Sequence, residues 1–138
     1  MRFASVEERD SAMRDFFKTH RVELVVDAGY DRIHTRPFLE AFRGRIINVH
    51  PSLLPEFAGG MDAVEQALRA RVKVSGATVH LVTEELDAGP ILFQESVPVL
   101  KHDTVESLRS RIHEAEYRIL PQAIRLMEAR LAQSPAVG

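Results

Sequence analysis

The stretch that decides the fold is residues 45–55, Arg-Ile-Ile-Asn-Val-His-Pro-Ser-Leu-Leu-Pro. Its first six residues predict a short strand, which ends at Pro51 because a proline cannot continue a central strand. Residues 23–29, Glu-Leu-Val-Val-Asp-Ala-Gly, predict another strand buried on both faces, which is typical of a parallel sheet. Helical patterns over residues 5–19 and 37–44 precede these two strands. The first half of the chain therefore has the helix–strand rhythm of an α/β fold.

The second half of the chain has a different pattern. Residues 75–83 and 91–99 alternate in part, and the turn-forming run 84–90 joins them, which predicts an antiparallel strand pair. A capping signal at Asp103 then opens a long helix. The predicted fold class is α/β, with parallel strands and helices, an antiparallel strand pair and a long C-terminal helix. We expect one domain over residues 1–132 and a flexible tail over residues 133–138.

Composition narrows the classes of protein. The 138 residues carry 18 Lys and Arg against 20 Asp and Glu, a net charge of −2, and they include no cysteine. The lack of cysteine excludes a disulfide framework, a zinc finger and a thiol nucleophile, and the balanced charge argues against a nucleic-acid partner. No segment reaches the roughly 18 apolar residues of a membrane span, and the N-terminus lacks a signal-peptide pattern. We therefore expect a cytoplasmic protein with no membrane partner.

Two polar residues stand at the end of the strand within residues 45–50. Asn48 and His50 are two positions apart, so strand geometry points both side chains the same way. Ligands of open α/β sheets bind beyond the carboxyl ends of the strands, where an amide and an imidazole can polarise a carbonyl as an oxyanion site. Equal weight goes to the alternative that both residues only satisfy backbone groups of the following loop.

Two further candidates come from the strand pair. Asp87 lies in the predicted turn, and a carboxylate beside His50 would raise the imidazole pKa, although spacing alone favours an ordinary turn aspartate. His80 lies inside a predicted strand, where a core histidine is the favoured interpretation. A metal site of His50, His80 and Asp87 lacks any tight ligand spacing, so we expect no metal. The glycines form neither G-x-G-x-x-G nor a P-loop pattern.

Three segments in order resemble the folate-dependent formyltransferases: residues 48–55, 76–80 and 85–92. The resemblance runs from about residue 22 to about residue 131. It implies a Rossmann-like formyltransferase fold, of which this chain corresponds to the C-terminal part, without the N-terminal half that carries a phosphate-binding loop. The implied reaction transfers a formyl group from 10-formyltetrahydrofolate, as co-substrate, to the amine of glycinamide ribonucleotide in purine synthesis.

The resemblance also implies a role for each matched residue. Asn48 and His50 would stabilise the tetrahedral oxyanion, while Asp87 would hold His50 protonated and help to carry away the amine proton. His80 would have a supporting role. The residues matched to folate contacts are Arg32, Ile33, His34, Thr83, Glu84, Glu85 and Leu86, and those matched to contacts with the ribonucleotide are Val49, Pro51 and Glu116.

Departures from the family pattern leave alternatives open. Asp31 and His34 stand where the family usually has methionine and leucine, which predicts an altered folate pocket. One alternative is a non-catalytic folate-binding half, or interaction module, that needs a partner chain. Another is a formyltetrahydrofolate deformylase or a different N-formyltransferase, although deformylases typically have a histidine at the position of Pro51. We also expect a homo-oligomer or a partner chain, because an exposed edge of a parallel sheet invites pairing.

Overall fold

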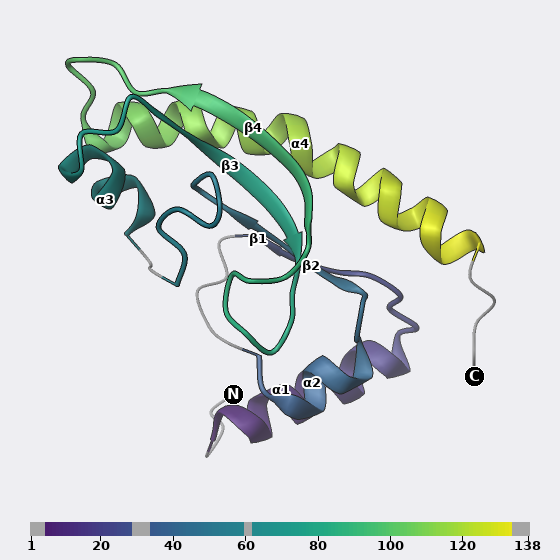
Figure 1. Cartoon of the computed structure of the whole chain (residues 1–138). Coiled ribbons are helices and arrows are strands. Elements are labelled where there is room, and N and C mark those ends of the chain that lie inside the picture. The colour runs from purple at the N-terminus through teal and green to yellow at the C-terminus, as the bar shows by residue number, and fades with distance from the viewer. Residues whose placement is uncertain (1–4, 29–33, 60–61, 134–138) are drawn as a thin grey trace.

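The structure, a computed structural model, describes residues 5–28, 34–59 and 62–133. It has a mixed α/β architecture with a four-stranded sheet (Figure 1), which confirms the predicted fold class. In chain order the elements are α1 (Val6–Thr19), β1 (Val25–Ala28), α2 (Arg36–Ala41), β2 (Ile46–His50), α3 (Ala63–Arg69), β3 (Val74–Leu81), β4 (Ile91–Pro98) and α4 (Val105–Gln133).

The sheet combines one parallel and two antiparallel pairings. Its strand order is β1-β2-β3-β4, with β1 parallel to β2 and the other neighbours antiparallel. The predicted antiparallel pair is confirmed as β3 and β4. Between them, Val79 pairs with Phe93 and His80 with Ile91, so Leu92 is an extra residue on β4. Such a bulge bends the strand and re-aims nearby side chains, and this one lies beside His80.

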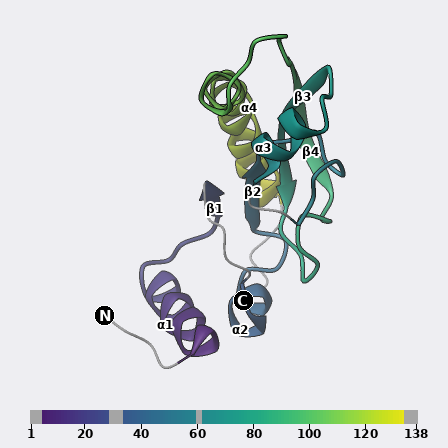
Figure 2. The ribbon, with the colours of Figure 1, turned by 90° about the vertical axis from the view of Figure 1, so that its left-hand side faces the viewer.

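Helix α4 covers one face of the sheet (Figures 1 and 2). Six of its apolar residues are buried: Leu108, Ile112, Ala115, Ile119, Ala123 and Met127. They pack with strand residues that include Ile47, Val79 and Val97. The helix is capped by Thr104, whose hydroxyl accepts from the Ser107 N–H at 3.1 Å, rather than by Asp103, which accepts from the Leu100 N–H at 2.7 Å and from Arg111 at 2.8 Å.

Helices α1 and α2 lie side by side, away from α4 (Figure 2). The predicted start of α1 is confirmed, since the Ser5 hydroxyl accepts from the Glu8 N–H at 3.0 Å. Both helices pack on the other face of β1 and β2, through a second apolar cluster of Val25, Phe38, Leu39, Phe42 and Ile46, with Met13 and Phe17 against it. No helix in the described residues is long and apolar enough to cross a membrane.

This second face also carries buried polar residues. Asp27 of β1 pairs in register with Asn48 of β2, which pairs in turn with His80 of β3. Paired residues of neighbouring strands project to the same face, so these three side chains form one row across the sheet. We call them the polar row. The row lies at the end of β1 and β2 where ligands of α/β sheets bind.

Candidate active site

The two polar residues of β2 lie on the face opposite α4. Ile47 and Val49 are buried in the α4 cluster, and the period of a strand turns Asn48 and His50 the other way. The side chain of Val49, matched above to the ribonucleotide, therefore packs in the core and leaves only its backbone for a ligand. Pro51 is half-buried at the start of the following loop.

His50 lies against two hydrogen-bond acceptors. Its Nε2–H donates to the Phe57 carbonyl at 3.2 Å, and its Nδ1 lies 3.5 Å from Asp87 Oδ2. Both side chains of the pair are buried, with 7% and 6% of their surface exposed. The Gly59 N–H also donates to Asp87 Oδ2, at 2.8 Å. The structure thus brings Asp87 to His50, an arrangement that spacing in the sequence did not favour.

A tight turn after β3 brings Asp87 to this position. Asp87 has a φ of 55°, in the left-handed region that aspartate adopts more readily than most residues. Gly89 is needed for the same turn, because a Cβ atom there would lie 1.7 Å from the Leu81 carbonyl oxygen. Residues 82–90 therefore fold back closely on the end of β3, and this return places the carboxylate beside the imidazole.

Burial dominates the electrostatics of His50. Loss of solvent lowers the imidazole pKa below its ordinary value, while the Asp87 carboxylate and the Phe57 carbonyl raise it without offsetting the burial. Asp87 thus acts on the His50 pKa in the expected direction, but burial outweighs it in the unliganded chain, and the expectation that Asp87 holds His50 protonated stays a prediction for the reacting complex. Burial outweighs the carboxylate because removing a charged imidazolium from water costs more free energy than one carboxylate at 3.5 Å returns. At neutral pH the ring is neutral.

His80 lies between Asn48 and Asp87. Its Nε2 accepts from the Asn48 side-chain amide at 3.3 Å, which assigns the proton to Nδ1, and Nδ1 donates to the Leu81 carbonyl at 3.0 Å. The same Nε2 lies 3.6 Å from Asp87 Oδ1. The Asn48 amide keeps one N–H for a ligand, and within the described residues its buried Oδ1 has no hydrogen-bond partner.

Thr78 is a site residue that the sequence did not single out. It is fully buried and pairs in register with His50. Its hydroxyl donates to the Ser52 carbonyl at 2.7 Å and accepts from the Leu54 N–H at 3.1 Å. Thr78 thus attaches the loop after β2 to the sheet. The position of Thr78 between two apolar residues of a strand could have indicated a buried, hydrogen-bonded hydroxyl.

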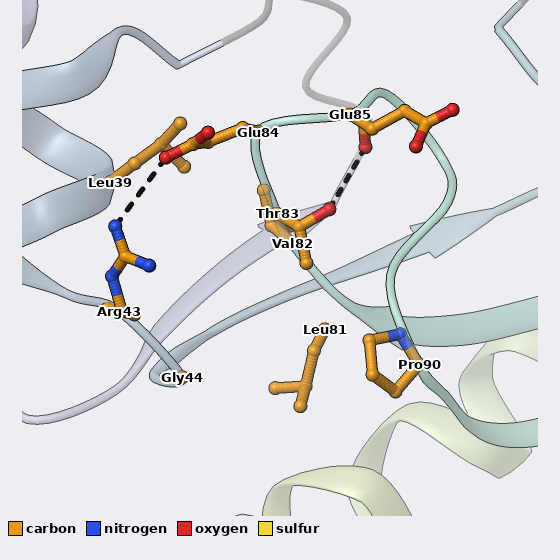
Figure 3. A pocket seen from close by; sticks show the side chains of 9 residues that line it. All are labelled: Leu39, Arg43, Gly44, Leu81, Val82, Thr83, Glu84, Glu85 and Pro90. Carbon is orange, nitrogen blue, oxygen red and sulfur yellow. Dashed lines mark hydrogen bonds and ion pairs between the residues drawn. The ribbon is translucent and has the colours of Figure 1, made fainter.

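A cavity of about 510 Å³ opens where β3 ends, at the start of β2, and the loop that carries Asp87 forms part of its wall (Figure 3). Its walls are largely apolar, and its rim carries Arg43 and Glu84, which lie 3.5 Å apart. Such a pocket suits a flat ring system with apolar faces and polar edges. The lining residues are Leu39, Arg43, Gly44, Leu81, Val82, Thr83, Glu84, Glu85 and Pro90.

The residues matched to folate divide into three groups. Thr83, Glu84 and Glu85 line the cavity, whereas Leu86 points into solvent with 45% of its surface exposed. His34 is buried and pairs with Asp27 at 2.8 Å instead of lining the cavity. Arg32 and Ile33 lie outside the described residues.

Glu116 of α4 acts on His50 through its charge. Its carboxylate accepts from His113 Nδ1 at 2.8 Å, and its charge raises the pKa of His50, although less than burial lowers it. A negative group thus stands near the imidazole from a second direction. Among the described residues, no group of three or more histidine and acidic side chains could hold a metal ion.

The fold and this cluster define a class of protein. The formyl transferase family matches residues 1–124, and the chain belongs to that family. The chain is 47% identical over 116 residues to phosphoribosylglycinamide formyltransferase of Bacillus subtilis (strain 168), an alignment that covers 84% of this chain and 59% of the relative. It is 46% identical over 136 residues to the trifunctional purine biosynthetic protein adenosine-3 of Gallus gallus, covering 99% of this chain and 14% of that protein.

Solved structures agree with the family. Glycinamide ribonucleotide transformylase 1 from Symbiobacterium toebii superposes with a TM-score of 0.88 at 50% identity, covering 91% of this chain and 58% of that one. Phosphoribosylglycinamide formyltransferase from Streptococcus pneumoniae TIGR4 gives 0.87 at 39% identity, covering 91% and 69%. The chain therefore spans less than two thirds of the B. subtilis and Gallus gallus relatives and of the S. toebii structure.

Proposed function

We propose that this chain carries the formyl-transfer site of an enzyme that moves a formyl group from 10-formyltetrahydrofolate to the amine of glycinamide ribonucleotide. The observation that carries the proposal is the convergence of Asn48, His50 and Asp87 around His80, with Asp87 on a loop that also lines an apolar cavity. The relatives named phosphoribosylglycinamide formyltransferase support the same reaction.

The proposed chemistry begins when the amine nitrogen attacks the formyl carbon. The carbonyl oxygen becomes an oxyanion, which accepts from the free N–H of Asn48 and interacts with His50. The carbon–nitrogen bond to the folate then breaks, and the formyl group stays on the former amine. One proton leaves that amine and one proton arrives at the departing folate nitrogen, so the exchange is balanced.

His50 is suited to carry that proton. The buried ring is neutral at neutral pH, so it can accept the amine proton as a general base. The imidazolium that forms lies 3.5 Å from Asp87 Oδ2 and 3.2 Å from the Phe57 carbonyl, both of which are acceptors. The developing oxyanion adds a further negative charge, so ring protonation becomes favourable only as the adduct forms.

The cavity would hold the ring system of the formyl donor. Leu39, Val82 and Pro90 would cover its faces, and the polar rim at Thr83, Glu84 and Glu85 would meet its nitrogen-bearing edge. The cavity begins at Leu81, the residue after His80 of the polar row, so a donor bound there would present its formyl group on the His80 side of that row. The ribonucleotide would approach from the side of Glu116.

Formyl transfer by the purified chain, with and without glycinamide ribonucleotide, tests this function. We expect turnover that requires the ribonucleotide and that Asp87→Asn lowers by about 10²- to 10⁴-fold, the usual contribution of acid–base catalysis. Asp15→Asn, at an exposed carboxylate of α1, is the matched control and should retain full activity. Full activity in Asp87→Asn would contradict the mechanism. Folate binding without turnover would support a binding half, and formate release without ribonucleotide would support a deformylase.

We also propose that the chain pairs with a second copy or another chain along β1. This strand is the last of the described sheet on its side, and Val26 on it is 36% exposed. Light scattering after size exclusion measures the mass directly, and a clean monomer would contradict the pairing. The cytoplasmic location and the single domain over residues 1–132 stay predictions of the sequence.

A further inference from the structure

A buried histidine–carboxylate pair lies outside the mechanism proposed above. His34 Nε2 and Asp27 Oδ2 are 2.8 Å apart, and only 2% and 10% of the two side chains are exposed. The His34 ring stacks on Phe38 with centroids 4.3 Å apart. The imidazole is therefore held in one orientation, with its Nε2 directed at Asp27.

The pair borders directly on the catalytic residues. Asp27 is the register partner of Asn48, and both project to the face opposite α4. Neighbouring strands are about 4.8 Å apart, so the Asp27 carboxylate is the next side chain along the polar row from the Asn48 amide. Asn48 is a proposed donor to the oxyanion, so a negative charge on its neighbour in the row would oppose the charge that develops there.

Two carboxylates, those of Asp10 and Asp27, face the His34 ring, and their other contacts show which of them His34 serves as a hydrogen-bond donor. Its Nδ1 lies 3.9 Å from Asp10 Oδ1. Asp10 is itself paired with Arg9 at 2.8 Å and accepts from the Thr35 hydroxyl at 2.8 Å and from the Thr35 N–H. The second carboxylate facing the imidazole is thus already compensated from α1, whereas Asp27 accepts from His34 at the shorter distance of 2.8 Å.

We infer that His34 and Asp27 form a positioning pair for the formyl-transfer site. His34 donates to the Asp27 carboxylate and fixes its orientation, so that the carboxylate next to Asn48 in the polar row is engaged by a donor when the oxyanion develops. Neither residue touches the reacting atoms, and the role depends on the function proposed above. The structure therefore assigns Asp27 and His34 to the electrostatics of the site rather than to the cavity wall.

Three variants test this role by comparing kcat with KM. His34→Leu removes the donor to the Asp27 carboxylate, and we expect kcat to fall about 10- to 100-fold while the KM for the formyl donor changes less than about 3-fold. Asp27→Leu combined with His34→Leu removes the carboxylate together with its donor and should return kcat to within about 3-fold of the parent chain. Asp27→Asn keeps the shape and the hydrogen bond, and it should stay within about 3-fold.

A purely structural pair would behave in the opposite way. The loss of kcat in His34→Leu would then follow its loss of folded protein, and Asp27→Asn would lose activity in parallel with its melting temperature. Either result overturns the inference. If circular dichroism shows that His34→Leu does not fold, the kcat of Asp27→Asn tests the inference by itself. A loss in its kcat of more than about 10-fold would mean that the carboxylate itself is required, which overturns the inference.

A readout without turnover separates this inference from the proposed function. The side-chain amide resonances of Asn48 in ¹⁵N–¹H NMR spectra should shift in His34→Leu and return in the double variant. If the parent chain shows no formyl transfer, the proposed reaction is wrong, but these spectra still test whether His34 and Asp27 act on Asn48. Unchanged Asn48 resonances in a folded His34→Leu variant would overturn the pair.

Discussion

The two faces of the sheet are built from alternate residues of the same strands and have opposite characters. Toward α4, Ile47, Val49, Val79 and Val97 pack only on apolar helix residues. On the other face the neighbouring positions Asp27, Asn48, His50, Thr78 and His80 are polar, and all but Asn48 are buried. Burying a polar group costs free energy unless it is hydrogen-bonded, so the second face is the less favourable one to build.

Hydrogen bonds and close charge pairs among the polar groups reduce the free-energy cost of burying them on the second face. Thr78 joins three neighbours, His34 pairs with Asp27, and His50 lies against Asp87 and Phe57. Asn48 Oδ1 is buried without a hydrogen-bond partner among the described residues, as is Ser75 Oγ elsewhere on β3. Departures from full satisfaction are expected at functional sites. Apolar burial on the α4 face therefore stabilises the fold, and this offsets the free-energy cost of burying the catalytic polar groups on the opposite face.

Replacing His50 should give the largest effect on activity. We expect His50→Ala to lower formyl transfer by about 10²- to 10⁴-fold, because it removes the general base, with little change in melting temperature. His102→Ala, at an exposed histidine, is the matched control and should be fully active. Equal activity in the two variants would mean that the polar face does not carry the reaction.

Replacing Ile112 should have the opposite signature. Ile112 is fully buried in the α4 cluster, so Ile112→Ala should cost about 2–5 kcal/mol of unfolding free energy through lost burial and a residual cavity. Denaturant unfolding measures the cost, and activity per folded molecule should be unchanged. A selective loss of turnover in folded Ile112→Ala would show that the two faces are coupled.

Gly89→Ala should disturb the site through the backbone. The added Cβ would lie 1.7 Å from the Leu81 carbonyl oxygen, so the turn that positions Asp87 must move. A displacement of about 1 Å at a catalytic group costs about 100-fold in rate, which steady-state kinetics would show. Full activity would mean that Asp87 does not depend on this turn.

The pH dependence of the rate should follow the lowered pKa of His50. Burial keeps the ring neutral at pH 7, so the base is available at neutral pH and is lost only as acid protonates it. We expect kcat/KM to be flat near neutrality and to fall about tenfold per pH unit on the acid side, below the ordinary histidine pKa of about 6.5. An acid limb centred above pH 7 would contradict the neutral imidazole.

The smallest effect is expected at the start of α4. The hydrogen bond from Arg111 lowers the pKa of the Asp103 carboxyl by more than burial raises it. The pKa of that carboxyl is therefore well below its usual range. A lowered pKa gives stability above about pH 4, the unfolded value, that is lost as the pH falls further. Asp103→Asn should therefore cost less than about 1 kcal/mol at pH 7, and the difference should vanish in acid. A cost that persists at low pH would exclude the ion pair as its cause.

Local patterns predicted much of this molecule. The cap at Ser5, the strand 46–50, the antiparallel pair and the apolar positions of α4 all follow from interactions within a few residues. The shared direction of the Asn48 and His50 side chains follows from the two-residue alternation of side chains along a strand. These features depend on backbone geometry that neighbouring residues set among themselves, so the amino-acid sequence by itself determined them.

Only the tertiary structure decided what these residues meet. The turn at Gly89 brings Asp87 to His50, strand register sets Asp27 beside Asn48, and the bulge at Leu92 lies beside His80. The sign of the His50 pKa shift also came from the fold, since spacing indicated a carboxylate but not the extent of burial. Register, turn conformation and desolvation depend on how distant segments pack together, and no local pattern contains that information.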